Sequence, residues 1–118
     1  METPLQLTFR SMPHSDTLAA HLRMRTDRLE RMFDHIISCH VVVELAADHH
    51  QHGDRCRFSI NVGLSGHEVV VSHAPQPGHV LDSASANADH AFDEAERQLE
   101  DWVTKRRDRR HEGPGDSP

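Results

Sequence analysis

The strongest constraint on the fold is an alternation of apolar and polar residues in the middle of the chain. Between residues 36 and 72, three segments repeat with a period of two, which is typical of strands with one buried face. We predict strands at 36–46, 56–64 and 67–72. A polar loop at 47–54 and a tight turn at Ser65-Gly66 join them, so the three strands should form an antiparallel meander.

Apolar residues at helical spacing flank this meander on both sides. The first stripe predicts a helix at 16–34, capped by Ser15 or Asp16. A second helix should begin at a cap on Asp82 or Ser83 and fray in the charged segment 105–111. The stripe of the second helix consists of Ala84, Ala88, Ala91, Phe92, Ala95, Leu99, Trp102 and Val103.

A further alternating segment, 5–10, predicts a strand before the first helix. The predicted order is therefore β-α-β-β-β-α. This is an α+β fold with a four-stranded sheet and two helices packed on one face of it. We expect residues 1–112 to form a single domain and residues 113–118 to form a disordered tail.

The predicted strand register keeps the two cysteines apart. If the 47–54 loop closes a hairpin, Leu45 lies opposite Cys56, and Cys39 lies opposite Val62. The cysteines are then separated by roughly 20 Å along the strands. A disulfide requires Cα atoms within about 7 Å of each other, so we expect two free thiols.

Sequence motifs of catalysis are missing from the chain. It has no Gly-rich phosphate loop, no G-x-S-x-G motif, no H-E-x-x-H motif and no tyrosine. We therefore expect a binding protein rather than an enzyme, with no cofactor and no small-molecule substrate.

The chain also lacks an apolar run of the ~20 residues that a membrane helix needs, and Met1–Pro4 lacks the layout of a signal peptide. We expect a cytoplasmic protein without membrane contact.

The loop at 48–54 is rich in potential metal ligands. His49, His50 and His52 lie between two aspartates, and such groups bind Zn²⁺, Ni²⁺ or Cu²⁺. Nothing in the sequence supplies the second shell that a functional metal site normally has. The favoured interpretation is a polar hairpin loop that binds metal adventitiously, and a metal-binding module is the alternative.

Basic residues cluster on both predicted helices and on the open face of the sheet. The arginine fork suits phosphate, which makes RNA a candidate partner, although ordinary surface charge also explains the pattern. The clusters comprise Arg23, Arg28 and Arg31; Arg55 and Arg57; and Lys105, Arg106, Arg107, Arg109 and Arg110. The open sheet face lacks stacking aromatic residues, so an RNA target would be folded and read by its shape and phosphates.

The net charge of −6, from 13 basic and 19 acidic residues, argues mildly against nucleic-acid binding. That sum counts the twelve histidines as neutral. With ordinary pKa values, the histidines would add about six positive charges at pH 6.5. Any affinity for RNA should therefore rise as the pH falls from about 7.5 to 6.

Several segments in order resemble one known family. Leu5–Arg10 resembles the first strand of the ribosome hibernation-promoting factor and ribosome-associated inhibitor A (sigma-54 modulation protein) family. The segment 29–34 with the strand after it is similar to the family's helix-to-strand junction, and His49–Gly53 is similar to its long loop. Residues 91–95 and 97–99 resemble its closing helix. The similarity covers about residues 4–107 and depends on the ordered set rather than on a single motif.

The resemblance implies a β-α-β-β-β-α fold and a bacterial protein without enzymatic activity. It implies binding to the small ribosomal subunit and its 16S-type rRNA, in the channel used by mRNA and tRNA. Translation would then be inhibited in idle ribosomes under stress. The chain ends before the second domain with which long members pair ribosomes, so it resembles the short type. The rRNA-binding residues implied are Arg23, Arg28, Arg31, Arg55, Arg57, Lys105, Arg106 and Arg107.

Two features depart from the family pattern. Ala84 and Asn87 stand where the family suggests an aromatic and an aliphatic residue, which indicates a looser start to the second helix. The middle of that helix is acidic where members are commonly basic, through Asp89, Asp93, Glu94, Glu96, Glu100 and Asp101. This acidity weakens the predicted rRNA affinity and leaves a further alternative, a paralogue that binds a basic protein through the acidic helix face.

Overall fold

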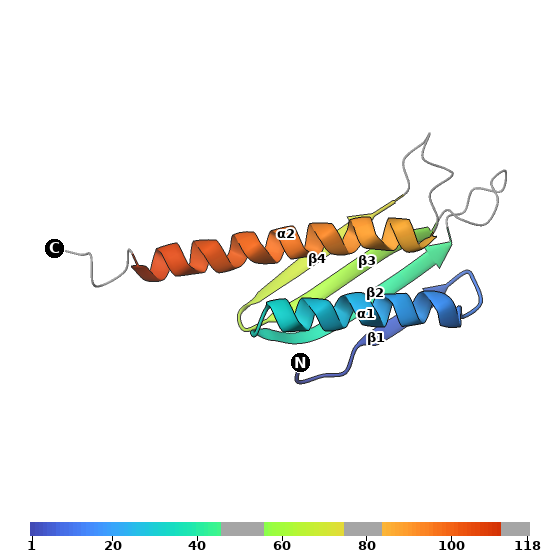
Figure 1. Ribbon diagram of the computed structural model, residues 1–118, viewed down its shortest axis with the longest axis horizontal. Helices are drawn as coiled ribbons and strands as arrows, with labels where there is room; N and C mark the ends of the chain where they lie inside the picture. Colours follow the sequence, from blue (N-terminus) through green and yellow to red (C-terminus); the bar gives the residue numbers. More distant parts are fainter. Residues whose placement is uncertain (46–55, 75–83, 112–118) are drawn as a thin grey trace.

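The computed structural model describes residues 1–45, 56–74 and 84–111, with side chains as far as residue 107. It confirms the predicted order of elements and the α+β fold (Figure 1). The elements are β1 (Gln6–Arg10), α1 (Asp16–Met32), β2 (Ile36–Leu45), β3 (Cys56–Leu64), β4 (His67–His73) and α2 (Ala84–His111). The predicted caps at Asp82 or Ser83, the 47–54 loop and the tail at 113–118 lie outside the described residues.

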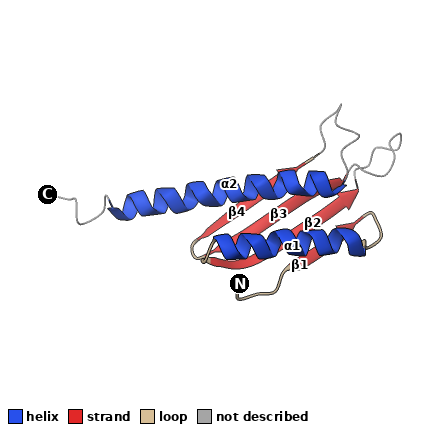
Figure 2. Cartoon of the chain, viewed as in Figure 1, coloured by secondary structure: helices blue, strands red, loops and turns tan. Residues whose placement is uncertain are grey.

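The four strands form one sheet in the order β1-β2-β3-β4 (Figure 2). Strands β2, β3 and β4 make the predicted antiparallel meander, and Gly66 in its last turn has φ +75°. This left-handed conformation is one that glycine adopts without steric cost. Strand β1 pairs with β2 in parallel, because α1 carries the chain back across the sheet between them.

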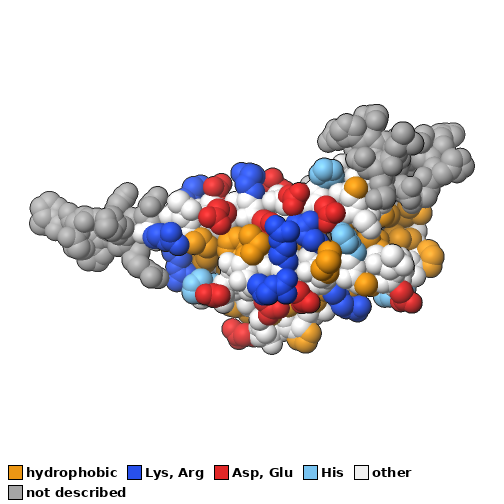
Figure 3. Space-filling model, viewed as in Figure 1, with side chains coloured by type: hydrophobic (Ala, Val, Ile, Leu, Met, Phe, Trp, Pro, Cys, Tyr) orange, Lys and Arg blue, Asp and Glu red, His pale blue; other side chains and the backbone are white. Residues whose placement is uncertain are grey.

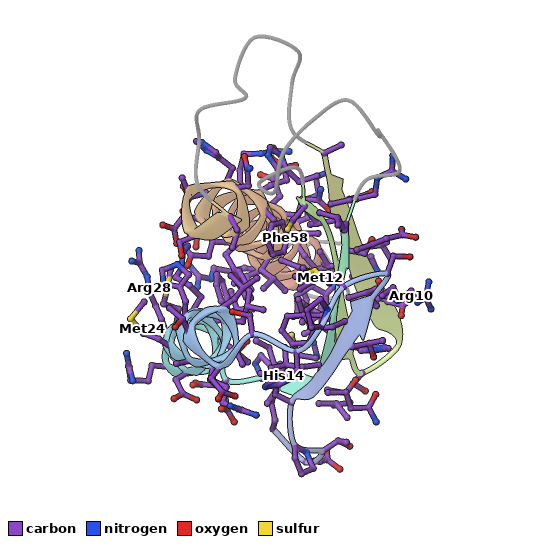
Figure 4. All side chains as sticks on the ribbon, turned by 90° about the vertical axis from the view of Figure 1, so that its right-hand side faces the viewer. Arg10, Met12, His14, Met24, Arg28 and Phe58 are labelled. Carbon is purple, nitrogen blue, oxygen red and sulfur yellow. The ribbon has the colours of Figure 1, made fainter. Side chains whose placement is uncertain are left out.

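Both helices cover the same face of the sheet, and the hydrophobic core lies between the two layers (Figures 1 and 4). The inward residues of the strands alternate as predicted, and Leu22, Leu29 and Leu99 on the helices are completely buried against them. The strands contribute the fully buried residues Val41, Val43, Phe58, Ile60 and Val62. The domain is thus built of two layers with one open sheet face.

The predicted register is confirmed at both cysteines. Leu45 pairs with Cys56, and Cys39 pairs with Val62. Both cysteines are buried, and neither forms a disulfide. Burial raises the pKa of Cys39 to about 11, and the charge of Glu30 adds to this effect while a hydrogen bond with Thr26 opposes it. A thiol with so high a pKa is a poor nucleophile, because the reactive thiolate is scarce at neutral pH.

The structure corrects the predicted face of the first residues of β2. The alternation placed Ile37 on the apolar face and Ile36 on the open face. A register shift between Ile36 and Ser38 reverses this, so Ile36 is buried and Ile37 is partly exposed. The physical reason is a β-bulge, in which an extra residue changes the side of the sheet on which the following side chains lie.

The start of α1 agrees with the prediction, whereas the C-terminal ends of both helices differ from it. Helix α1 begins after Ser15, whose hydroxyl oxygen accepts a hydrogen bond from the backbone N–H of Leu18 at 3.2 Å. It ends at Met32, two residues before the predicted end, because Phe33 turns extended and packs into the core. Helix α2 continues to His111 instead of fraying from residue 105. Lysine and arginine are good helix formers, and they interact favourably with the dipole at a helix C-terminus.

The burial of both thiols predicts their reactivity. At pH 8 the native protein should react with a thiol reagent far more slowly than a free cysteine does, because Cys39 and Cys56 are both 1% exposed. After denaturation, two thiols per chain should react at the rate of a free cysteine. A native protein that reacts as fast as the denatured one would contradict the burial of both side chains.

Candidate nucleic-acid interface

A buried arginine closes the seam between the two helices. Arg25 on α1 is only 6% exposed, and its guanidinium bonds three carboxylates of α2. Nη1 donates to Oδ1 of Asp89 at 2.6 Å. Nη2 donates to Oδ1 of Asp93 at 2.9 Å and to Oε2 of Glu96 at 3.1 Å. The Arg25 guanidinium also lies 5.5 Å from the ring centre of Phe92, so the charge rests on an aromatic face.

Hydrogen bonds within the cluster around Arg25 stabilise the charged forms of Arg25 and Asp89. Burial opposes the charge of Arg25, but hydrogen bonds with Asp93, Asp89 and Glu96 raise its pKa overall. Burial likewise opposes the charge of Asp89, yet Arg25 and the nearby His21, whose Nε2 is 2.8 Å from Asp89 Oδ1, lower the pKa of that carboxyl. The guanidinium Nε of Arg25 has no hydrogen-bond partner, so the cluster uses both terminal nitrogens and leaves one donor unpaired.

This cluster gives the acidic centre of α2 a structural role, because part of it pairs with α1. Three of its six acidic residues, Asp89, Asp93 and Glu96, pair with Arg25 inside the domain. Glu94 bonds Arg97 and Gln98 on its own helix, which lowers its pKa to about 2. These four carboxylates therefore pair with arginines of the same chain, which reduces the acidic surface that α2 offers to a basic protein.

Three of the four arginines of α1 are exposed in the helix layer. Arg23 and Arg31 are exposed. Arg28 is also exposed, with its Nε 3.4 Å from Oε2 of Glu96. Figure 4 shows Arg28 and Met24 pointing away from the sheet. In the space-filling view, basic side chains gather over the middle of the helix layer and near the C-terminal end of α2 (Figure 3).

The second basic group lies where α2 extends past the sheet (Figure 1). Lys105 and Arg107 are exposed there, whereas Arg106 folds over the ring of Trp102 at 5.1 Å from its centre. His67, just after the β3–β4 turn, stacks on Trp102 with ring centres 5.6 Å apart and planes only 9° from parallel. We call Lys105, Arg106 and Arg107 the basic end of α2.

Arg57 lies on the opposite side of the domain. Strand pairing places it in one row with Glu44 and Arg10 on the open sheet face, and Figure 4 shows Arg10 pointing away from the helices. The structure thus brings two groups of predicted residues together in the helix layer, Arg23, Arg28 and Arg31 with the basic end of α2. It separates Arg57 from both groups. Arg55 lies outside the described residues.

Trp102 lines several hollows, two of which bear on its role. The larger, of about 700 Å³, is lined by the β3–β4 turn and one side of α2, through Ser65, Gly66, His67, Gln98, Asp101, Trp102, Lys105 and Arg106. The smaller, of about 270 Å³, lies between the end of α1 and α2, where Arg107 and His35 reach it. The apolar stripe predicted Trp102 as a core residue. It does pack against the core, but it also lines these hollows, which the stripe did not predict. The available signal was a lone tryptophan one helical turn before a run of basic residues.

The described part of the chain contains no cluster of potential metal ligands. Across residues 1–45, 56–74 and 84–107, no three side chains of His, Cys, Asp or Glu come together closely enough to hold a metal ion. The predicted alternative ligands His49, His50 and His52 lie outside the described residues. Among the described helices, none is long and apolar enough to cross a membrane.

Comparison with known proteins places this fold in a family. The family model described as sigma 54 modulation protein / S30EA ribosomal protein matches residues 5–111. The chain therefore belongs to this family. A comparison with curated protein sequences gives no significant match.

Two solved structures are similar to this chain. A ribosomal subunit interface protein from Coxiella burnetii matches with a TM-score of 0.68 and 17% identity, over 85% of this chain and 97% of that one. The N-terminal domain of Protein Y from Thermus thermophilus matches with a TM-score of 0.62 and 26% identity, over 82% of this chain and 94% of that one. The first shows the shared fold alone, because the identity is so low.

The Arg25 cluster predicts a specific loss of stability. Replacing Arg25 with Ala removes the buried cation that Asp89, Asp93 and Glu96 share, and should lower the free energy of unfolding by about 2–4 kcal/mol. Arg97→Ala is the matched control, because it removes only exposed pairs on α2 and should cost much less stability than Arg25→Ala. Urea denaturation at pH 7 measures both, and equal losses would contradict the role of the cluster.

The same pair of variants should show a pH signature. The folded protein holds the pKa of Asp89 below its ordinary value of 3.8, so its pairing stabilises the fold above that pH. This stabilisation is lost as the pH falls through the lowered pKa. The stability difference between wild type and Arg25→Ala should therefore shrink below about pH 4.

Proposed function

We propose that the protein binds the small ribosomal subunit and inhibits translation by occupying the channel for mRNA and tRNA. Its membership of the family described as sigma 54 modulation protein / S30EA ribosomal protein supports this proposal. The observation that carries it is the charge of the helix layer. Arg23, Arg28 and Arg31 and the basic end of α2 belong to the helix layer, and two acidic residues of that layer, Asp93 and Glu96, pair with the buried Arg25.

Phosphate contacts would supply the affinity. An arginine donates two parallel hydrogen bonds to phosphate oxygens, and exposed arginines on helices reach a curved RNA surface without a change in the backbone. Each contact releases counterions from the RNA, so the affinity should fall steeply as salt increases. Inhibition of this kind is steric and requires no catalytic group on the protein.

The helix layer, rather than the open sheet face, is the proposed contact surface. The sheet face offers Arg57 and Arg10 with Glu44 between them in the same row, so its local charge is partly cancelled. The helix layer offers six basic residues of the predicted set. Variants on the two faces therefore distinguish the two possible orientations on the ribosome.

Sedimentation with small ribosomal subunits across a salt series tests the proposal. The wild-type protein should pellet saturably at low salt and be released as salt rises. The triple variant Arg23→Gln, Arg28→Gln, Arg31→Gln should bind at least about tenfold more weakly. Its slope of log affinity against log salt should fall by about two to three units, because three phosphate contacts are gone.

The matched control is Arg10→Gln with Arg57→Gln, which removes charge from the opposite face and should leave binding within about twofold. A stronger loss in this control than in the triple variant would assign the interface to the sheet face. Absence of pelleting at any salt concentration would contradict ribosome binding by this chain.

A further inference from the structure

Trp102 has an unusual place for an apolar residue of a core stripe. Leu99 and Ala95, which precede it on the same stripe, are fully buried, whereas Trp102 is only partly buried at the edge of the larger hollow. Its ring is covered by His67 in a nearly parallel stack and by the Arg106 guanidinium. The three flat groups come from two elements, α2 and the start of β4, which fix them in position.

The groups around the stack are polar and mostly cationic. Lys105 and Arg106 line one side of the hollow, and Gln98 and Asp101 offer hydrogen-bonding groups along α2. The exposed turn residues Ser65 and Gly66 form the opposite rim, where Gly66 presents no side chain. A volume of about 700 Å³ lies within the range of ordinary small-ligand sites.

The geometry points to a binding site for an unpaired RNA base, stacked in the hollow on the exposed ring of His67 and so extending the Trp102 stack, with its phosphate against Lys105 and Arg106. This inference rests on the proposed function, because it takes ribosomal RNA as the source of the base. It assigns a task to Trp102 and His67 that phosphate recognition alone does not require. It also refines the expectation of recognition by shape and phosphate, because a stacking surface exists away from the sheet face.

Other ligands fit the hollow less well. An apolar segment of a protein would bury Lys105, Arg106 and Asp101 without partners, which is costly. A bare anion would use the cations and leave the aromatic stack without a role. A paired base in an RNA helix exposes only its edges, whereas an unpaired base offers the flat face that stacks on aromatic side chains.

Trp102 gives this site its own optical signal. It is the only tryptophan in a chain without tyrosine, so the intrinsic emission of the protein reports on the surroundings of this residue. Titration with short single-stranded RNA should quench the emission saturably. An RNA of the same length without bases, and a fully paired duplex, should quench much less. Equal quenching by the RNA without bases would overturn base stacking.

The same fluorescence titration is also done with a free mononucleotide. Because it lacks the neighbouring phosphates that reach the basic end of α2, it should bind at least about tenfold more weakly than the oligomer. If it binds as tightly as the oligomer, the hollow is a site for a free nucleotide, and the assignment to RNA is overturned.

Variants separate stacking from charge. With labelled single-stranded RNA, Trp102→Leu should weaken binding about tenfold while the salt dependence stays unchanged, because the side chain carries no charge. Trp102→Phe, which keeps a ring, should restore most of the affinity. Lys105→Gln with Arg106→Gln should instead reduce the salt dependence. Wild-type affinity in Trp102→Leu would overturn the inference, and circular dichroism checks that each variant folds.

Ribosome sedimentation separates this inference from the proposed function. If Trp102→Leu pellets with small subunits as well as wild type does, ribosome binding stands and the base site is wrong. If wild type fails to pellet but single-stranded RNA quenches Trp102 as described, the base site stands and the partner is another RNA. Arg10→Gln on the open sheet face is the control variant for both measurements.

Discussion

The buried guanidinium of Arg25 is the interaction on which the arrangement of the helix layer depends. Two helices must share one apolar sheet face, and their seam places a charged group out of contact with water. Such a charge is tolerated only when it is paired, and three carboxylates from the partner helix supply the pairing. The acidic centre of α2 is thus a structural requirement of α1, set by the packing of one helix against the other.

This pairing determines which charges the protein presents to a partner. The chain carries a formal charge of −6, yet a large part of its negative charge on α2 is engaged with arginines of the same chain. Along α1 the exposed charged residues are Arg23, Arg28 and Arg31 with Asp16 and Asp27, and Lys105 and Arg107 are exposed near the end of α2. A summed charge therefore describes this surface poorly, and the distribution of paired and unpaired residues decides what approaches it.

The sequence predicted the elements well where one periodic signal dominated. The register of the β2–β3 hairpin was right at both cysteines, because a slip by one residue would have moved the whole apolar face of a strand into solvent. The bulge at Ile36 was missed because Ile36 and Ile37 are equally apolar, so the pattern holds no sign of which one is buried. The end of α1 was missed because Phe33 suits both the helix stripe and the extended segment after it.

The candidate site was less predictable, because its contacts join residues far apart in the chain. Arg25 meets its partners 64 to 71 positions later, and single-sequence periodicity contains nothing about such pairs. Trp102 looked like one more apolar residue of a stripe, and only the position of His67 beside it reveals a stacking surface. The exposed arginines were found from the sequence, but their division between two opposite faces required the fold.

The extension of α2 past the sheet has a consequence for the energetics of binding. The last turns of this helix have no sheet beneath them, so they depend on backbone hydrogen bonds and on contacts near Trp102 (Figure 1). Short stretches of helix without tertiary packing open at little cost in free energy. A ligand held there would have to order the helix end as well as contact it. Affinity at this end of the protein is therefore linked thermodynamically to local folding, and substitutions that strengthen the helix alone should tighten binding without touching the ligand.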